Sequence, residues 1–516
     1  MSTTHVQGKL TIAVDIGTTS TKTLLIGPEG QVIASHSAGY PLHTPSPEIA
    51  EQDPEDIYQA VRQGISNVMM ACTAAKEDIL CVSFSSAMHS LILLDRDNVP
   101  LTRMITWADS RSQAAARKLI ESGKGLDIYL STGTPIHPMS PLVKLVWMKE
   151  NRFPDYEAAA MFVGIKEYIF HKLFGTFVID YSIASATGMF NLDRLEWDGA
   201  ALAAAGVSEQ QLSMPVPTTY TLRGLSGEDA DVLGLAPDTP FVAGASDGVL
   251  ANLGSSVLDS RRMAVSIGTS SAIRTVVPKP TFDPQGRLFC YALTEDHWVI
   301  GGASNNGAIV LQWVVDQLFG PEAEQHKLSG RDPYEMLLQQ AESIDPGADG
   351  LLFLPLLTGE RAPFWNADAR GVFFGLSLVH GKSHMLRAAL EGVIYQVAVI
   401  HELLQQMSGE CEEIVASGGF ARSPLWCRML ADVLGQTVVI PTVVDSSGLG
   451  AARLGMYAVG AIDTLTPFAN ELEGIRYEPD QARHERYKRL LPLYRQIYEQ
   501  LKTQFTELAR LQRQGD

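Results

Sequence analysis

Short apolar runs rich in β-branched residues open the chain, and the spacing of apolar positions then changes from strand-like to helical. Residues 10–14 and 21–26 predict the two strands of a β-hairpin, and residues 31–35 predict a third strand after a Gly-Pro-Glu-Gly turn. Over residues 53–70 the apolar side chains recur at helical spacing, which predicts an amphipathic helix. Further strands are expected at residues 79–83 and 91–94. Strands followed by a helix and more strands indicate α/β architecture.

The second half of the chain repeats this plan and adds a helix near its end. A helix is expected at residues 308–318 and a strand at 413–417, followed by a Gly-Gly turn. Within the first half, residues 110–230 are more helical, and we interpret them as an insertion that builds a substrate-facing surface. Five apolar residues at helical spacing predict a C-terminal helix that packs on the core: Leu493, Ile497, Leu501, Phe505 and Leu508.

One segment of eight residues occurs twice. Ala13–Ser20 recurs 251 positions later as Ala264–Ser271, and six of the eight residues are identical. Each copy predicts a strand that enters a Gly-Thr turn, where small residues let backbone N–H groups and hydroxyls approach a phosphate. Two such loops, Gly17-Thr18-Thr19 and Gly268-Thr269-Ser270, indicate one nucleotide held in a cleft between two similar halves.

The two copies differ at a position that carries chemistry. Asp15 in the first copy is replaced by Ser266 in the second, so only the first loop offers a carboxylate to Mg²⁺ or to a metal-bound water. Lys22 follows the first loop, where it either offsets phosphate charge or is a solvated lysine at the end of a strand. We therefore expect the first loop on the metal side of the nucleotide.

Length and charge narrow the class of protein. A chain of 516 residues exceeds what one hydrophobic core usually supports, so we expect two domains, 1–252 and 253–516, that meet in a Gly-, Ala- and Ser-rich stretch. The net charge of −18 argues against a nucleic-acid or anionic-membrane partner. Five scattered cysteines without a CxxC pair, no hydrophobic leader and no membrane-length apolar run predict a cytoplasmic protein. The oligomeric state stays open, with a homodimer among the states considered.

Two common nucleotide-binding motifs do not fit this sequence. The segment from Gly375 to Gly381-Lys382-Ser383 has five residues between its glycines, where a P-loop has four and wraps the phosphate with consecutive N–H groups. No GxGxxG sequence follows a predicted strand, which excludes a dinucleotide-binding domain of that type.

Residues 15–22, together with 267–270, resemble the nucleotide-binding core of the superfamily of sugar kinases, actin and heat-shock chaperones. Two longer segments, 139–151 and 371–391, resemble the two signatures of the FGGY carbohydrate kinases at every specified position. The resemblance implies two similar ribonuclease H-like α/β domains of the actin and sugar-kinase type, with the nucleotide cleft between them. It also implies an ATP- and Mg²⁺-dependent sugar kinase.

Within the family, residues 85–90, 133–141, 164–168 and 244–249 are most similar to kinases that convert D-gluconate to 6-phospho-D-gluconate, which implies gluconate and ATP as the small-molecule partners. The resemblance also implies Asp247 as the general base for the attacking hydroxyl. Capping of a helix that begins at Gly248 is an alternative role for Asp247, and both roles are compatible.

The same resemblance implies the other residues at the sugar. Trp107 and Asp109 match a W-x-D-x-R segment that lines the sugar site, although Asp109 has an alternative role as N-cap of a helix over 111–120. His137 and Lys166 are the candidates to face the substrate carboxylate. The implied substrate residues are Met88, His89, Trp107, Asp109, His137, Lys166 and Asp247.

At the adenosine end, residues 418–423 match the Gly-rich turn that the family packs against purine and ribose, with a plain strand-to-helix turn as the alternative. Gln312, on the predicted helix, is a further nucleotide contact. The nucleotide residues are Gly17, Thr18, Thr19, Lys22, Gly268, Thr269, Ser270, Gln312, Gly418, Gly419 and Ser423, with Asp15 at the metal.

Two other functions remain as alternatives. Kinases of xylulose, or of another pentulose or polyol, are similar at Met88-His89 and near Lys166 but differ around His137 and Ser246. A non-catalytic, nucleotide-dependent sugar-binding regulator on the same scaffold is an alternative of a different class. The presence of Asp247 argues against this regulator, because a protein that transfers no phosphoryl group has no chemical need for a base.

Overall fold

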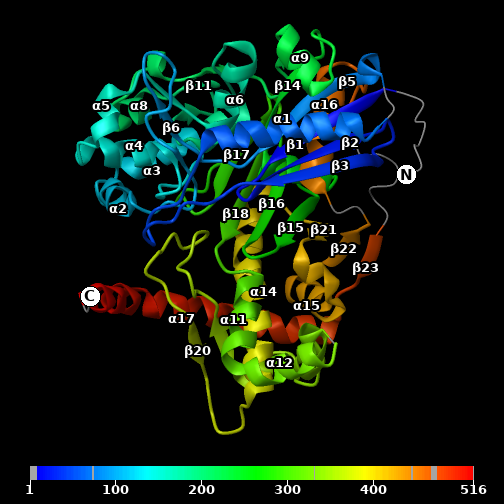
Figure 1. Cartoon of the computed structure of the whole chain (residues 1–516). Helices are drawn as coiled ribbons and strands as arrows, with labels where there is room; N and C mark the ends of the chain where they lie inside the picture. Colours follow the sequence, from blue (N-terminus) through cyan, green and yellow to red (C-terminus); the bar gives the residue numbers. More distant parts are fainter. Residues whose placement is uncertain (1–8, 73–74, 331, 443–444, 467–473, 515–516) are drawn as a thin grey trace. The chain divides into compact units, whose positions relative to one another are not determined.

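The computed structural model describes residues 9–72, 75–330, 332–442, 445–466 and 474–514, and Figure 1 shows its elements along the sequence. The chain divides into two compact units. The first unit comprises Met1–Leu258, Val276–Ile300 and Asp445–Leu472, and the second comprises Asp259–Thr275, Gly301–Val444 and Glu473–Asp516, as far as these segments are described. The domain limits 1–252 and 253–516 stay a prediction, and the compact units differ from them because the first unit also takes two later segments.

A six-stranded mixed sheet forms the framework of the first unit. Its strand order is β13 (Thr221–Leu222), β14 (Phe241–Ser246), β5 (Ile79–Ser86), β1 (Leu10–Ile16), β2 (Ser20–Ile26) and β3 (Val32–Gly39). β1 pairs antiparallel with β2 and parallel with β5, which in turn pairs parallel with β14. The predicted hairpin and the strand at 79–83 are confirmed, and the third strand is longer than predicted.

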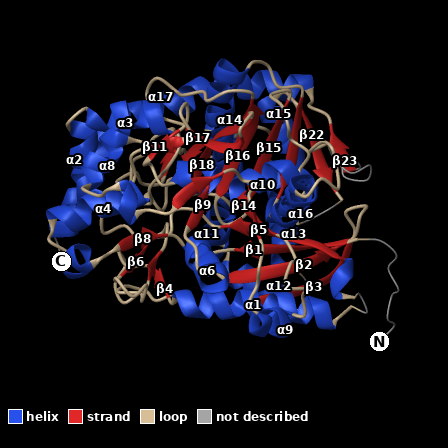
Figure 2. Cartoon of the chain, turned by 90° about the horizontal axis from the view of Figure 1, so that it is seen from above, coloured by secondary structure: helices blue, strands red, loops and turns tan. Residues whose placement is uncertain are grey.

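Helices cover both faces of this sheet, because consecutive residues of a strand point to opposite sides. α1 (Pro54–Met70) lies against β2 and β3, with Gly64 beside Thr23. α16 (Ser446–Ala458) lies against β1 and β5, with Gly448 beside Leu24. Figure 2 shows the same unit from above, with α1 and α9 (Gly227–Leu233) along one side of the strands. The helix predicted over 53–70 is confirmed, and the Asp53 side chain caps it by accepting a hydrogen bond from the backbone N–H of Glu55.

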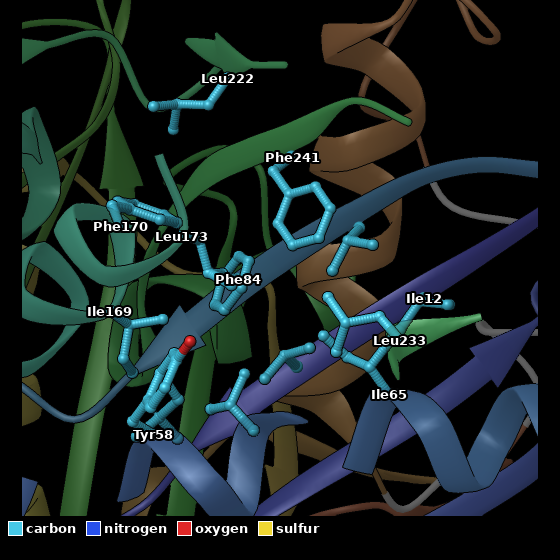
Figure 3. Packing of buried hydrophobic residues seen from close by; sticks show 14 of the residues in the cluster. Ile12, Tyr58, Ile65, Phe84, Ile169, Phe170, Leu173, Leu222, Leu233 and Phe241 are labelled. Atoms are coloured by element: carbon cyan, nitrogen blue, oxygen red, sulfur yellow. The ribbon is translucent and has the colours of Figure 1, made fainter. Parts of the chain in front are cut away.

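An aromatic cluster lies in the core between this sheet and the helices on the α1 side (Figure 3). The ring of Phe84 on β5 meets the ring of Phe170 edge to face, with centroids 5.1 Å apart, and lies 6.1 Å from the ring of Phe241 on β14. All three side chains are fully buried. Aromatic pairs of this geometry add to the stabilisation that comes from burial of their area.

The middle of the first half is helical, as predicted. Its helices are α2 (Gln113–Glu121), α3 (Lys124–Thr132), α4 (Pro141–Glu150), α5 (Pro154–Ala158), α6 (Ile165–Phe174), α7 (Tyr181–Ala186) and α8 (Gly199–Ala205). Short strands link them: β4 (Glu51–Gln52), β6 (Ile92–Leu94), β7 (Met104–Ile105), β8 (Met161–Val163), β9 (Val178–Asp180), β10 (Phe190–Asn191), β11 (Glu196–Trp197) and β12 (Met214–Val216). β17 (Phe289–Thr294) belongs to the first unit, and β18 (His297–Ser304) continues into the second.

Two of the predicted helix caps are wrong. α2 begins at Gln113 with Ser112 at the N-cap position, so Asp109 does not cap it. α10 (Asp247–Gly254) has Ser246 at the N-cap position, which places Asp247 inside the first turn of the helix. In both cases the helix boundary differs from the prediction by only one or two residues, which sequence patterns do not resolve.

The second unit contains the sheet strands β16 (Ser271–Val277), β15 (Arg262–Ile267), β21 (Glu413–Ser417), β22 (Thr437–Pro441) and β23 (Gly474–Tyr477), in this order. A two-stranded sheet of β19 (Leu352–Leu354) and β20 (Val372–Phe374) lies outside it. The helices are α11 (Ala308–Leu318), α12 (Gly320–Leu328), α13 (Pro333–Glu342), α14 (Lys382–Ser408), α15 (Pro424–Leu434) and α17 (Gln481–Gln514). The helix predicted at 308–318 and the strand predicted at 413–417 are confirmed with the same bounds.

The C-terminal helix exists, but the predicted buried face is partly wrong. α17 starts earlier than expected, and Leu493 and Leu508 are 50% and 46% exposed. Tyr494 and Tyr498 are buried instead, and the hydroxyl of Tyr494 donates to Gln396 Oε1 on α14 at 3.0 Å. A search for aliphatic residues alone misses this face, because tyrosine supplies both apolar area and a hydrogen bond.

Candidate functional site

The repeated segment forms two similar hairpins, one in each unit. The last residue pair between β1 and β2 is Ile16 with Thr21, which leaves residues 17–20 between them. The last pair between β15 and β16 is Ile267 with Ser271, which leaves residues 268–270. The N–H of Gly17 donates to Ser20 O at 3.0 Å, and the N–H of Gly268 donates to Ser270 O at 2.9 Å. The second turn is thus one residue shorter, a difference that the sequence alignment alone does not reveal. Each hairpin is followed by a parallel strand, β5 or β21, so the duplication extends to the sheets.

The carboxylate of Asp15 is held by two hydroxyl groups at the end of β1. Ser85 Oγ donates to Asp15 Oδ1 and Ser447 Oγ donates to Asp15 Oδ2, each at 2.6 Å. Lys22, which pairs with Asp15 in the strand register, forms a partly exposed ion pair with Asp445 at 2.6 Å. Two fixed hydrogen bonds hold the carboxylate in one orientation, as a residue that orients a ligand requires.

The donor set around Asp15 fits a metal ion that is held mainly by its nucleotide. Among the described residues, no group of three or more His, Cys, Asp and Glu side chains is arranged to hold a metal ion. Mg²⁺ keeps several water ligands and is usually bound through one or two carboxylates together with substrate phosphates. A single oriented carboxylate beside the first phosphate loop meets that requirement.

Several predicted residues line one small cavity in the first unit. Trp107 Nε1–H donates to Thr18 Oγ1 at 3.0 Å, and Gln52 Nε2–H donates to Thr18 O at 2.7 Å. Gly17, Thr18, Met88 and Trp107 are among the lining residues. The structure therefore brings the first phosphate loop next to two of the residues predicted at the sugar.

Asp109 is buried and its carboxylate is fixed by Arg111. Asp109 Oδ1 accepts from the backbone N–H and from Nε of Arg111 at 3.2 and 3.0 Å, and Oδ2 accepts from the N–H of Ala50 at 3.2 Å. The other end of the Arg111 guanidinium pairs with Glu51 at 2.6 Å. The charge of Asp109 is therefore compensated by Arg111, and the carboxylate is rigidly oriented.

A buried lysine that the sequence analysis did not single out connects His89 to the segment after His137. Lys144 Nζ donates to the carbonyl oxygens of His89 and Met139, each at 2.7 Å. His89 Nδ1 lies 2.7 Å from Ala186 O, so this ring nitrogen carries a proton and donates to the carbonyl. Burial lowers the pKa of Lys144 to about 7. A single charge within the apolar run 142–146 was the signal that could have identified Lys144.

Lys166 is buried in an ion pair, which the sequence did not indicate. Its Nζ lies 2.6 Å from Asp180 Oδ2 and 3.4 Å from Ala245 O, and both charged side chains are at most 2% exposed. Burial lowers the pKa of Lys166. The charge of Lys166 is thus compensated by Asp180 inside the protein. The carbonyl that Lys166 contacts belongs to Ala245, two residues before Asp247 in the sequence.

The end of β14, directly before Asp247, is joined to α7. Ser182 Oγ donates to Ser246 Oγ at 3.0 Å and accepts from the N–H of Ser246 at 3.1 Å. Asp247 is partly buried, and its Oδ1 accepts from the N–H of Gly248 at 2.6 Å. Two buried hydrogen bonds thus fix the residue before Asp247, and Asp247 itself is only partly buried.

The predicted adenosine residues meet in a cavity of about 870 Å³ inside the second unit. Thr269 of the second loop, Gln312 of α11, Gly419 and Ser423 all line it. Gly418 precedes this wall with φ of 102°, and a Cβ there would lie 2.4 Å from Ile267 O, so only glycine fits. Ser423 also caps α15 by accepting from the N–H of Trp426.

One wall of this cavity comes from α13, which no sequence motif marks as functional. The lining residues from this segment are Asp332, Tyr334, Leu338, Gln339 and Glu342. Arg428 on α15 also lines the cavity and forms an ion pair with Glu342 at 2.5 Å. Volume and lining suit a nucleoside-sized ligand, since small-molecule sites are commonly mostly apolar cavities of about 300–1,000 Å³ with a few polar groups.

Comparison with known proteins places the chain in a family. The N-terminal domain model of the FGGY family of carbohydrate kinases matches residues 10–254, and the C-terminal domain model matches residues 263–459. Both Gly-Thr loops lie within these matches, whereas β23 and α17 lie beyond them. The protein is a sugar kinase, and its chain belongs to the FGGY family of carbohydrate kinases. The predicted fold class, family and enzyme class are confirmed.

Named relatives cover almost the whole chain. A gluconokinase of Bacillus licheniformis is 48% identical over 505 residues, which is 97% of this chain and 98% of the relative. A gluconate kinase structure from Lactobacillus acidophilus has a TM-score of 0.91 at 35% identity and covers 97% of this chain and 99% of its own. A ligand-bound xylulose kinase structure from the same organism has the same TM-score and identity and covers 97% and 100%. Within the described part of this chain, no helix is long and apolar enough to cross a membrane.

Proposed function

We propose that this kinase transfers the γ-phosphoryl group of ATP to D-gluconate and forms 6-phospho-D-gluconate. The observation that carries the proposal is the 48% identity to a gluconokinase over 97% of the chain. The segments around His137 and Ser246, where kinases of xylulose differ, support it. Kinases of this kind need little covalent chemistry from the protein, so positioning and charge stabilisation carry most of the catalysis.

ATP binds with its adenosine in the cavity of the second unit, against Gln312, Gly419 and Ser423. Its phosphates lie on the Gly-Thr loops at 17–19 and 268–270, where backbone N–H groups meet negative charge. Asp15 is the residue that would hold Mg²⁺ at the first loop, and Lys22, which pairs with Asp445 in the free protein, would add positive charge there. When bound, Mg²⁺ neutralises charge that develops on the transferred phosphoryl group.

Gluconate binds in the first unit, against Met88, His89, Trp107 and Asp109. The oriented Asp109 carboxylate accepts hydrogen bonds from substrate hydroxyls, and Trp107 packs against the carbon chain. Lys144 supports this site by holding the backbone of His89 and Met139. The substrate carboxylate faces His137 and Lys166. Lys166 is paired with Asp180, and His137 Nδ1 accepts from the backbone N–H of Met139 at 3.2 Å.

Asp247 acts as the general base. It orients the terminal hydroxyl of gluconate and takes its proton as the oxygen attacks the γ-phosphorus. The partly buried carboxylate at the start of α10 is held between a fixed Ser246 and the N–H of Gly248, which supports this role. A base must lie within hydrogen-bond reach of the proton that it removes.

A coupled ADP-release assay with gluconate, xylulose, ribulose and glycerol tests the function. We expect turnover on gluconate with kcat/KM at least tenfold above that on xylulose. Xylulose stays the second candidate because of the equal TM-score of a xylulose kinase structure. Turnover on xylulose with none on gluconate would overturn the proposal, and ATP binding without any sugar turnover would support a non-catalytic regulator.

The Asp247→Asn variant provides the matched test of the base in the same assay. We expect kcat to fall by roughly 10²- to 10⁴-fold, because proton transfer is lost while the shape of the side chain is kept. The Kd for ATP stays within about twofold of the parent value, since the nucleotide cavity lies in the second unit. A kcat near that of the parent protein would exclude Asp247 as the base.

A further inference from the structure

Glu360 is a fully buried residue of the second unit, in the segment of the sequence that connects β19 to β20. Its Oε2 accepts from Ser304 Oγ at 2.7 Å and from Asn306 Nδ2 at 3.2 Å. Its Oε1 accepts from the backbone N–H groups of Asn305 and Arg361, each at 2.8 Å. Three of these four donors come from consecutive residues, 304–306, so one carboxylate fixes the whole turn between β18 and α11.

The amide of Asn306 reinforces the same turn. Its Nδ2 also donates to Gly359 O at 2.8 Å, and its Oδ1 accepts from the N–H and the hydroxyl of Thr358 at 3.3 and 3.2 Å. Ser304, Asn306 and Glu360 are each 0% exposed. Buried polar groups that are fully hydrogen-bonded hold a single conformation, because each lost bond would leave an unsatisfied group in a low-dielectric environment.

The residues that follow this turn, Gly307 and Ala308, contact the second phosphate loop. The N–H groups of Gly307 and Ala308 donate to Thr269 O at 3.0 Å and to Gly268 O at 2.6 Å. A Cβ on Gly307 would lie 2.5 Å from both Gly268 O and Ser270 O, so the loop rests on the start of α11 without room for a side chain. The loop carbonyls are therefore bound to α11, which leaves its opposite side for an anionic ligand.

We infer that Glu360 is a positioning residue for the nucleotide phosphates: it sets the Ser304–Gly307 turn against which the second phosphate loop rests. The inference deepens the proposed function and rests on ATP as the phosphoryl donor. Glu360 itself does not touch the nucleotide. Its carboxylate accepts hydrogen bonds from four protein donors. The phosphates are contacted by the second phosphate loop and not by Glu360. Gln312 lies further along α11 and lines the adenosine cavity.

Glu360→Gln tests this role, because glutamine keeps the size of the side chain but replaces one acceptor oxygen by an NH₂ group facing existing donors. We expect the Kd for ATP to rise about tenfold, while the Kd for adenosine changes by less than about twofold. Both constants are measured by calorimetry on the full chain with Mg²⁺ and without sugar. The result is thus independent of which sugar the enzyme phosphorylates.

Glu391→Gln is the matched control. Glu391 is equally buried in the second unit, where its Oε1 accepts from Gly347 N, Arg387 Nε and Tyr487 Oη at 3.0, 2.6 and 2.8 Å. Its substitution perturbs the same unit without touching the phosphate loop, so the ratio of the ATP and adenosine Kd values should stay unchanged.

Ser304→Ala is the second variant, in case Glu360→Gln does not fold. It removes one donor to Glu360 and should raise the same ratio by about threefold. An unchanged ratio in Glu360→Gln, or in Ser304→Ala if Glu360→Gln does not fold, would overturn the inference, and so would an equal rise in Glu391→Gln.

Discussion

Two lysines of the first unit are buried beside the proposed sugar site, and their charges are compensated differently. Lys144 donates to two carbonyl oxygens, and its pKa falls to about 7 because burial disfavours the charged form. Lys166 is paired with Asp180 in a contact that is at most 2% exposed. Lys144 therefore connects backbone segments, whereas Lys166 is half of a buried ion pair whose removal leaves a charge behind.

The Lys166→Met variant should lose roughly 3–5 kcal/mol of unfolding free energy, because it leaves the Asp180 carboxylate buried without its partner. The double variant Lys166→Met with Asp180→Asn should recover much of this loss, since both charges are then removed. Chemical denaturation of the parent, both single variants and the double variant measures the coupling. Additive losses without recovery would show that the ion pair contributes little beyond packing.

At the scale of elements, α10 and α16 pack through glycines, and both helices begin at the proposed site. α10 starts at Asp247, and α16 starts next to Ser447, which holds Asp15. A Cβ on Gly450 would lie 2.0 Å from Leu250 O, and one on Gly254 would lie 1.7 Å from Ser446 O. The backbones of the two helices therefore approach too closely for any side chain at these positions.

The Gly450→Ala variant should lose roughly 3 kcal/mol of stability or more, because the clash is with backbone that cannot rotate away. Separation of the helices should also lower kcat, since the proposed base and the Ser447–Asp15 bond shift together. Gly227→Ala is the control, because a Cβ at the start of α9 meets nothing within 4 Å. Thermal melting and the gluconate assay compare the two variants, and equal melting temperatures would contradict the glycine contact.

At the scale of the whole molecule, one strand plan is used twice. The order β2-β1-β5-β14-β13 in the first unit matches β16-β15-β21-β22-β23 in the second, with the same parallel and antiparallel pairings. The chain crosses between the two units more than once, because the segment Asp445–Leu472 belongs to the first unit again. All strands of the first sheet come from residues 10–246, but the helix that covers one of its faces, α16, comes from far along the sequence.

A fragment that ends at residue 258 should not fold cooperatively. It lacks α16, whose buried residues cover the face of β1 and β5 opposite α1, so apolar strand surface would meet water. A chain that joins residues 1–258, 276–300 and 445–472 through Gly/Ser linkers should regain a cooperative thermal transition. Circular dichroism melts compare the two, and a sharp transition in the shorter fragment would contradict this dependence.

The sequence alone determined the elements that depend on local patterns. Turn residues between β-branched runs located both phosphate hairpins, and helical spacing located α1 and α11. The repeat predicted two similar halves because a duplicated strand and turn sequence favours the same local backbone each time. Family motifs identified the sugar-kinase class and the candidate residues for binding the nucleotide and the sugar.

Only the tertiary structure decided which distant side chains meet. The Lys166–Asp180 pair, the Ser447–Asp15 hydrogen bond and the four donors around Glu360 join segments that no local pattern connects. The same holds for the wall that α13 adds to the cavity proposed for adenosine. Local sequence fixes the backbone through short-range sterics and hydrogen bonds, but the compensation of buried charge depends on packing that brings remote residues within a few ångströms.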